Sequence, residues 1–339
     1  MVQEKLRISL TTRRLLIMAS YTIEEGFLAL PDKPSEVYTR TTRPAKSIQS
    51  RARLVFIHGF SDHCNAQDDL FIPLAEKGII IYSFDQRGWG RSVKKAADKG
   101  KTGTTDQVMD DITYFIKNHV LARQEEAHLP VFIMGHSMGG QETLTYATIG
   151  PKDVVSRIRG FMAEAPWIAL HPSTQPWKLT VVLGRMASKL MPHYHMVNEL
   201  DANLLSRDPD VNDGYVKDPL CHNTGTLEGL AGMLDRALAL NEHKNLVPEG
   251  VGEGGKTRLW LGHGTGDAIC DFLPAKRYFE NLKIADKQMM TYEGWYHKLH
   301  AEPGQDKVKF AEDVSKWILD RSGPLSEADG AAAAGRSRL

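Results

Sequence analysis

The chain has 339 residues, of which 42% are hydrophobic and 25% charged, values typical of a globular protein with one large domain or two modest ones. The 42 Lys and Arg residues balance the 42 Asp and Glu residues, so the sequence lacks the basic excess of a dedicated nucleic-acid-binding protein. Three cysteines are too few for a disulfide framework, and no apolar run is long enough for a transmembrane helix.

The chain opens with a leader, residues 1–20, that we expect to be disordered, with Met18 as an alternative start to Met1. Two short strands are then predicted at residues 23–28 and 36–41, joined by a turn rich in proline.

A regular alternation of buried strands and helices follows. Continuous apolar runs predict strands covered on both faces at residues 54–57, 79–84, 131–134, 160–163, 258–261 and 288–292. Helical patterns lie at residues 106–122, 141–149 and 274–282. The alternation predicts an α/β fold with a mostly parallel, doubly wound sheet, built from residues 21–166 and 237–322.

Residues 167–236 interrupt this alternation and are predicted to form an inserted helical cap. Within them, the stretch from Trp177 to Met191 predicts a helix with a wide apolar face edged by basic residues. That pattern is typical of a helix lying at a lipid surface. The alternative is that the apolar face packs on the core while the basic side chains are merely solvated.

The strongest local motif is Gly-His-Ser-Met-Gly at residues 135–139, which fits the G-x-S-x-G nucleophile elbow. The motif needs glycines because a sharp strand-to-helix turn brings the flanking backbone close to its neighbours. The predicted strand 131–134 precedes it and a helical pattern follows, as the motif demands. Ser137 is therefore the candidate nucleophile.

A serine hydroxyl needs a base that is oriented by a carboxylate. Asp267 follows the predicted strand 258–261, and His297 follows the predicted strand 288–292, in the chain order that this fold requires. We assign Asp267 as the acid and His297 as the base. Asp271 is the alternative acid, although a helix-capping role fits it better, and His300 is the alternative base.

Two backbone N–H groups are expected to form the oxyanion hole, those of Met138 and of Phe60.

His58 could act as a base, but a structural role is favoured. Neither Gly88-Trp89-Gly90 nor Gly262-His263-Gly264 continues into the G-x-G-x-x-G fingerprint of a dinucleotide-binding site. His193 and His195 lack a suitably spaced third ligand for a metal. We therefore expect no cofactor and no metal.

With these residues in place, the sequence resembles the monoacylglycerol lipase family of α/β-hydrolases, in particular its fungal branch. The resemblance spans residues 21–321 and is carried by HGFSDH (58–63), FDQRGWG (84–90), GHSMGG (135–140), LHP (170–172) and YEGWYHKLH (292–300). It implies an α/β-hydrolase fold, a cap with an apolar mouth, and Cys270 beside the alcohol pocket. The last role has an alternative, a small buried apolar residue. His136 and His300 are the other expected substrate-binding residues.

The resemblance implies hydrolysis of a monoacylglycerol to fatty acid and glycerol through an acyl-enzyme intermediate. The animal-type members carry an arginine after the oxyanion loop, and this chain has none at residues 64–67, which puts glycerol specificity in doubt. An acyl-CoA or specialised-metabolite ester is therefore the alternative substrate. A non-catalytic ligand receptor on a hydrolase scaffold is a remote alternative, because it predicts a damaged triad.

Residues 323–339 have the composition of a flexible tail and end in Ser337-Arg338-Leu339. This ending differs from the Ser-Lys-Leu peroxisomal address only by one basic residue for another. We expect recognition by the peroxisomal import receptor and a peroxisomal location, with the cytoplasm or a lipid droplet as the alternative.

Overall fold

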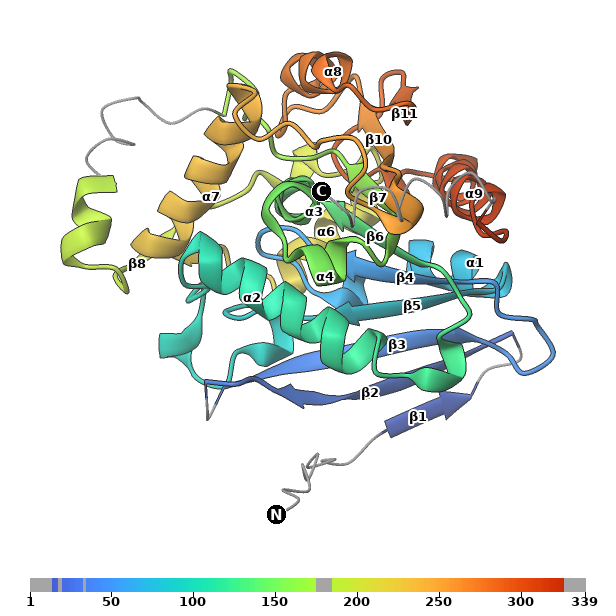
Figure 1. Cartoon of the computed structure of the whole chain (residues 1–339). Coiled ribbons are helices and arrows are strands. Elements are labelled where there is room, and N and C mark those ends of the chain that lie inside the picture. Colours follow the sequence, from blue (N-terminus) through green and yellow to red (C-terminus); the bar gives the residue numbers. More distant parts are fainter. Residues whose placement is uncertain (1–13, 18–19, 33–34, 175–184, 326–339) are drawn as a thin grey trace, which may run out of the picture.

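The computed structural model describes residues 14–17, 20–32, 35–174 and 185–325. A nine-stranded sheet with the order β1-β2-β3-β5-β4-β6-β7-β10-β11 runs through the molecule (Figure 1). Its strands are β1 (Arg14–Ile17), β2 (Tyr21–Ala29), β3 (Glu36–Pro44), β4 (Ala52–Ile57), β5 (Ile79–Phe84), β6 (Val131–His136), β7 (Ile158–Glu164), β10 (Arg258–Gly264) and β11 (Asp286–Tyr292). The strands from β5 to β11 in this order pair in parallel, whereas β1, β2 and β3 pair antiparallel.

Helices cover both faces of the sheet. The core helices are α1 (Asp68–Glu76), α2 (Thr105–Phe115), α3 (Met138–Ile149), α4 (Lys152–Val155), α8 (Phe272–Asn281) and α9 (Gln305–Asp320). On β4, Leu54 and Phe56 pack with α1 and α9, whereas Val55 and Ile57 pack with α2, α3 and α8. The strand thus sends alternate apolar side chains into two separate cores, as expected for a doubly wound sheet.

The eight strands and three helices predicted from the sequence are all present, within a few residues of their expected bounds. Helix α2 continues into a π-helical turn at Ile116–Val120, which completes the predicted helix 106–122. Helix α3 begins at Met138, three residues before the predicted 141. The expectation of a wholly disordered leader is wrong for Arg14–Ile17, which pairs with β2 as the edge strand β1.

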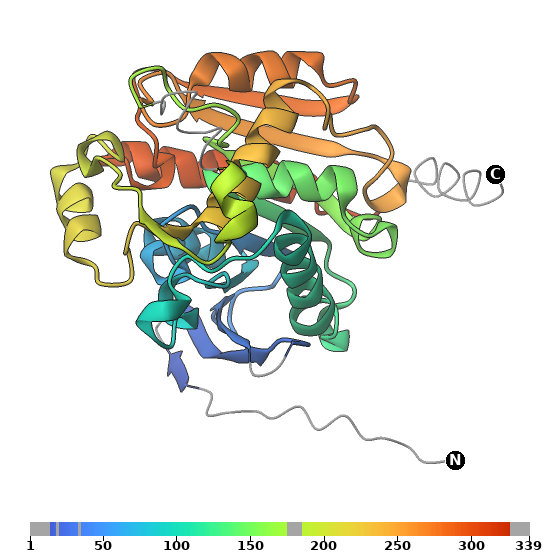
Figure 2. The same cartoon turned by 90° about the vertical axis from the view of Figure 1, so that its left-hand side faces the viewer.

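The predicted cap belongs to the segment between β7 and β10, and its described residues lie beyond the carboxyl ends of the parallel strands (Figures 1 and 2). Its elements are the strands β8 (His195–Val197) and β9 (Thr224–Thr226), the helices α6 (Pro209–Lys217) and α7 (Leu227–Asn241), and a helical stretch at residues 185–190. Helix α7 runs unbroken across the predicted boundary at residue 236. Residues 177–184 of the predicted amphipathic helix, and the tail from residue 326, lie outside the described residues.

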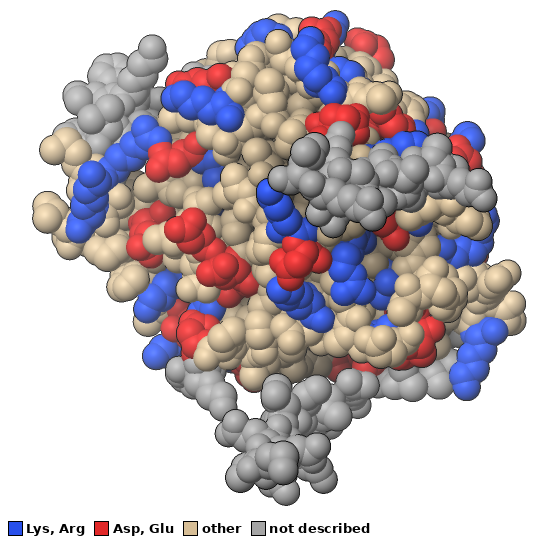
Figure 3. Space-filling view, viewed as in Figure 1, with Lys and Arg blue, Asp and Glu red and all other residues tan. Residues whose placement is uncertain are grey.

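The face of the molecule seen in Figure 3 carries interspersed basic and acidic side chains, in keeping with the even charge balance of the chain. Among the helices that the structure describes, none has both the length and the apolar character needed to cross a bilayer.

Candidate active site

Ser137 sits at the sharp turn between β6 and α3. Its backbone has a φ of 56° and a ψ of −116°, a conformation that is costly for a residue with a side chain. Three hydrogen bonds hold it there: the Ser137 N–H donates to the Glu164 carbonyl, and the Ser137 carbonyl accepts from the N–H groups of Gln141 and Trp167. The turn therefore has the geometry of the nucleophile elbow that the sequence predicts.

Asp267 and His297 come together beside this turn, each from the loop that follows a parallel strand. His297 Nδ1 lies 2.7 Å from Asp267 Oδ2, and Asp267 Oδ1 accepts the N–H groups of Ile269 and Cys270 at 2.8 and 2.9 Å. Burial alone would raise the pKa of Asp267, but the facing His297 and these hydrogen bonds hold it below its ordinary value. Asp267 is thus a fixed carboxylate that orients the imidazole.

Ser137 and His297 line one cavity of about 280 Å³. The structure therefore brings together the three residues that the sequence singles out, although they are 130 and 30 positions apart in the chain. The alternative acid Asp271 is instead the N-cap of α8, where its side chain accepts the Leu273 N–H at 2.9 Å. Chemically, the arrangement can hold a hydroxyl beside an imidazole of fixed orientation.

The expected oxyanion loop lies directly against the elbow. A Cβ added at Gly59 would meet Ser137 Cβ at 3.1 Å and His136 Nδ1 at 3.3 Å, so only a glycine lets the loop approach this closely. Phe60 follows Gly59 and lines the cavity, and Met138 is the first residue of α3. An N–H in the first turn of a helix has no carbonyl acceptor within the helix, which leaves it available to an anion.

His58 has a structural place behind this loop. Its Nε2 accepts the Gln86 N–H at 2.9 Å, and burial lowers the pKa of the ring. The interpretation of His58 as a base finds no support in these contacts.

The three expected substrate-binding residues have different positions. His136 lines the cavity, is buried against the His297 backbone, and has a pKa lowered to about 3 by burial. Cys270 is buried and is not among the residues that line the cavity, and burial raises the pKa of its thiol.

The expectation for His300 is not met. The ring of His300 is fully buried, and its Nδ1 lies 2.7 and 2.9 Å from the two carboxylate oxygens of Glu164 at the end of β7. It is absent from the residues that line the cavity. The hydrogen bonds to Glu164 on β7 hold the His300 ring away from the cavity, and no feature of the sequence around His300 signals this contact.

The cavity also holds polar residues that the sequence analysis did not select. Asp62 accepts a hydrogen bond from Gln67 Nε2 at 2.8 Å, and Lys298 Nζ lies 3.4 Å from the same carboxylate oxygen. Burial would raise the pKa of Asp62, but the charge of Lys298 holds it well below its usual range. Asp62 lies in the oxyanion-loop motif and Lys298 follows His297, so proximity to the motifs was the available signal. Asp218 also lines the cavity but comes from the cap, where no sequence motif lay close enough to signal it.

A second cavity of about 220 Å³ lies under the cap and is mostly apolar. Leu200 lines both cavities. The apolar lining of the second cavity includes Trp167, Leu170, Met196, Leu204, Leu227, Leu230, Met233, Leu234 and Ile269. The cavity that Ser137 and His297 line carries the charged side chains of Asp62, Asp218 and Lys298, and it adjoins the more apolar second cavity at Leu200.

Comparison with known proteins places this chain in a family. The family model described as "Serine aminopeptidase, S33" matches residues 48–304. A putative monoglyceride lipase of Schizosaccharomyces pombe is 33% identical over 291 residues, covering 86% of this chain and 73% of the relative. The chain belongs to the monoacylglycerol lipase family of α/β-hydrolases.

Further relatives of the monoacylglycerol lipase family agree with this. The monoglyceride lipase of Saccharomyces cerevisiae is 27% identical over 274 residues, covering 79% of this chain and 84% of the relative. The crystal structure of a soluble variant of that yeast enzyme, in complex with a substrate analog, matches with a TM-score of 0.74 and 22% identity. It covers 95% of this chain and 99% of the other. The predicted fold is confirmed, and the chain is a serine carboxylic-ester hydrolase by family.

Proposed function

We propose that this family member hydrolyses monoacylglycerol to fatty acid and glycerol through an acyl-enzyme intermediate. One observation carries the proposal: Ser137 and His297 line a cavity with charged side chains at its wall, and this cavity adjoins a more apolar one under the cap. A monoester of glycerol has a polar alcohol at one end and a long apolar chain at the other. We assign the alcohol to the cavity that Ser137 lines and the acyl chain to the more apolar one.

In the first half-reaction, His297 Nε2 takes the proton of the Ser137 hydroxyl as Oγ attacks the ester carbonyl. The carbonyl electron pair moves to oxygen, where the N–H groups of Phe60 and Met138 stabilise the negative charge. When this intermediate collapses, the bond to glycerol breaks and His297 returns its proton to the leaving oxygen. Asp267 holds the imidazole and stabilises its charged form.

In the second half-reaction, a water molecule repeats the cycle on the acyl-enzyme. His297 takes a proton from the water as it attacks, and the collapse of the second intermediate frees the fatty acid and returns the proton to Ser137. These residues account for each proton transfer, so the proposed mechanism routes no step through a metal or cofactor.

A hydrolysis panel tests the substrate class. The purified protein is compared on a monoacylglycerol, the matching diacylglycerol and the matching acyl-CoA, with Ser137→Ala as the blank. We expect the highest kcat/KM on the monoacylglycerol and a loss of at least about 10⁴-fold in Ser137→Ala. Higher kcat/KM on the acyl-CoA would favour the thioesterase alternative. Failure of the folded protein to react with a fluorophosphonate at Ser137 would favour the receptor alternative.

We also propose that the cap contacts a lipid surface. Several large apolar side chains of the described part of the cap are exposed, with Leu190 reaching 84%; they are Met186, Leu190, Met191, Tyr194 and Val197. The basic residues Arg185 and Lys189 lie in the same stretch of chain. Exposed apolar residues edged by basic ones favour binding at a lipid–water interface.

Co-sedimentation with anionic lipid vesicles tests this contact. We expect Leu190→Asp to lower vesicle binding by about thirtyfold, because inserting a leucine side chain stabilises the bound state by about 2 kcal/mol. Leu273→Asp is the matched control, since Leu273 is 57% exposed on α8, outside the cap. Equal binding of both variants and the parent protein would contradict the proposal.

A further inference from the structure

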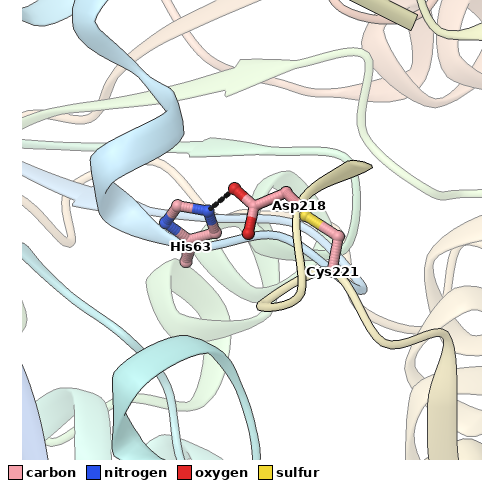
Figure 4. A group of neighbouring side chains, drawn as sticks. All are labelled: His63, Asp218 and Cys221. Carbon is pink, nitrogen blue, oxygen red and sulfur yellow. Dashed lines mark hydrogen bonds and ion pairs between the residues drawn. The ribbon is translucent and has the colours of Figure 1, made fainter. Parts of the chain in front are cut away.

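The side chains of His63, Asp218 and Cys221 form a cluster (Figure 4). One potential ligand atom from each residue lies within 4.8 Å of the other two. His63 belongs to the oxyanion loop, three residues after Phe60, whereas Asp218 and Cys221 belong to the cap between α6 and β9. Asp218 and Cys221 line the cavity, and the buried His63 lies behind them.

Local hydrogen bonds hold the cluster in shape. His63 Nε2 lies 2.9 Å from Asp218 Oδ2. The other oxygen of this carboxylate accepts the Leu220 N–H at 2.8 Å, and the Asp218 carbonyl accepts the Cys221 N–H at 3.1 Å. On the core side, the His63 carbonyl accepts Gln67 Nε2 at 3.0 Å. Both halves of the cluster are thus set by their own loops, so a ligand would find its donor atoms already placed.

The donor set is one imidazole nitrogen, one carboxylate oxygen and one sulfur. This mixture suits a borderline-soft cation such as Zn²⁺, whereas Mg²⁺ and Ca²⁺ prefer oxygen ligands alone. Three protein ligands leave a fourth position of a tetrahedral ion open, and here that position would face the cavity that contains Ser137 and His297.

We propose that Zn²⁺ binds His63, Asp218 and Cys221, and that bound zinc inhibits hydrolysis. The Cys221 thiol gives up its proton to solvent as the sulfur–metal bond forms. The ion occupies the alcohol side of the cavity and ties the cap to the loop that carries the Phe60 N–H. It takes no part in the hydrolysis itself.

Titration with Co²⁺ tests the site without reference to activity. Cobalt bound to a thiolate gives a charge-transfer absorption in the near ultraviolet, and Zn²⁺ should displace it. We expect one cobalt ion per chain with this absorption, its loss in Cys221→Ser, and at least about tenfold weaker zinc binding in Cys221→Ser and Asp218→Asn. Circular dichroism shows that each variant is folded. The surface variant His195→Asn is the matched control and should bind as the parent does.

The inhibition is then measured on a short acyl ester, with each variant compared with its own zinc-free rate. We expect micromolar Zn²⁺ to inhibit the parent and His195→Asn, Mg²⁺ to leave both unchanged, and Cys221→Ser to need at least about tenfold more zinc. Absence of thiolate absorption in the parent, or its persistence in Cys221→Ser, would overturn the site. Zinc binding without inhibition would overturn its regulatory role. The cobalt titration holds whatever the natural substrate is, so its failure is distinguishable from failure of the proposed function.

Discussion

At Asp267 the fold fixes a carboxylate by two backbone N–H groups, so that its other oxygen can hold the His297 ring. We expect Asp267→Asn to keep the fold and to lower kcat by about 10⁴-fold, because the amide stabilises the wrong tautomer of the imidazole. Steady-state kinetics on a short acyl ester check this, with KM expected to change little.

Asp271→Asn is the natural control, because Asp271 is the other acid in the same loop and caps α8. Asparagine is as good an N-cap as aspartate, so activity and stability should both be close to those of the parent. Equal losses of kcat in the two variants would contradict the assignment of the acid.

His136 links the site to the pH dependence of stability. Its folded-state pKa is lowered from 6.5 to about 3 by burial, so the folded protein holds it neutral where the unfolded chain protonates it. Its contribution is therefore fully present above about pH 6.5 and is lost as the pH falls toward 3. At pH 5 the loss amounts to about 2 kcal/mol of unfolding free energy. Urea unfolding at pH 7.5 and at pH 5 measures this loss. The free energy of unfolding of His136→Asn should decrease less between the two pH values than that of the parent.

At the scale of elements, the close contact between the oxyanion loop and the elbow gives a sharp prediction. Gly59→Ala places a methyl group 3.1 to 3.3 Å from atoms of Ser137 and His136, so the loop must move by a few tenths of an ångström. A donor displaced from the oxyanion costs up to about 10²–10³-fold in kcat. We expect a loss within that range in a folded protein. Gly26→Ala on β2, where the added methyl meets only Thr39 Oγ1 at 3.8 Å, should change kcat far less.

The elements show what the sequence could and could not specify. Buried strands such as β4 were predictable because both of their faces are covered, which leaves a continuous apolar run. The elbow was predictable because its steric needs require particular residue types. Strand β1 was not, since Arg14–Ile17 follows a polar stretch and gains its pairing only from β2.

Some contacts between distant segments could not be predicted from the sequence either. The hydrogen bond of His300 with Glu164 and the approach of Asp218 to His63 depend on the tertiary fold, and no local pattern encodes either contact. The meeting of Asp267, His297 and Ser137 was predictable across a similar distance because the topology sends the loops after parallel strands to one edge of the sheet.

For the whole molecule, a buried ion pair joins the returning cap helix α7 to the core helix α3. Arg236 lies 3.2 Å from Glu142, and both side chains are almost fully buried. Burial raises the pKa of Glu142 to about 7 despite the facing arginine. The pair thus joins the cap to the core. Burying each charge costs desolvation energy, and the opposite charge of the partner offsets that cost.

The two partners should respond differently to substitution. Glu142→Leu leaves a buried guanidinium that cannot lose its charge, so we expect a destabilisation of about 3–5 kcal/mol. Arg236→Met should cost less, because Glu142 can take up a proton. Chemical denaturation measures both, and replacing Asp213 in the exposed Lys217–Asp213 pair should cost under about 1 kcal/mol. Similar losses at the buried and the exposed pair would contradict this account.

Leu200 is shared by the two cavities, and this has a consequence for how the enzyme could change its preference. Because Leu200 lines both the cavity that we assign to the alcohol and the one that we assign to the acyl chain, we expect its bulk to affect how much of the ester each cavity can accept. Adaptation to a shorter acyl chain or a larger alcohol would therefore need no change in the reacting residues. A single substitution in the cap, far in sequence from Ser137, would be enough to redistribute the space.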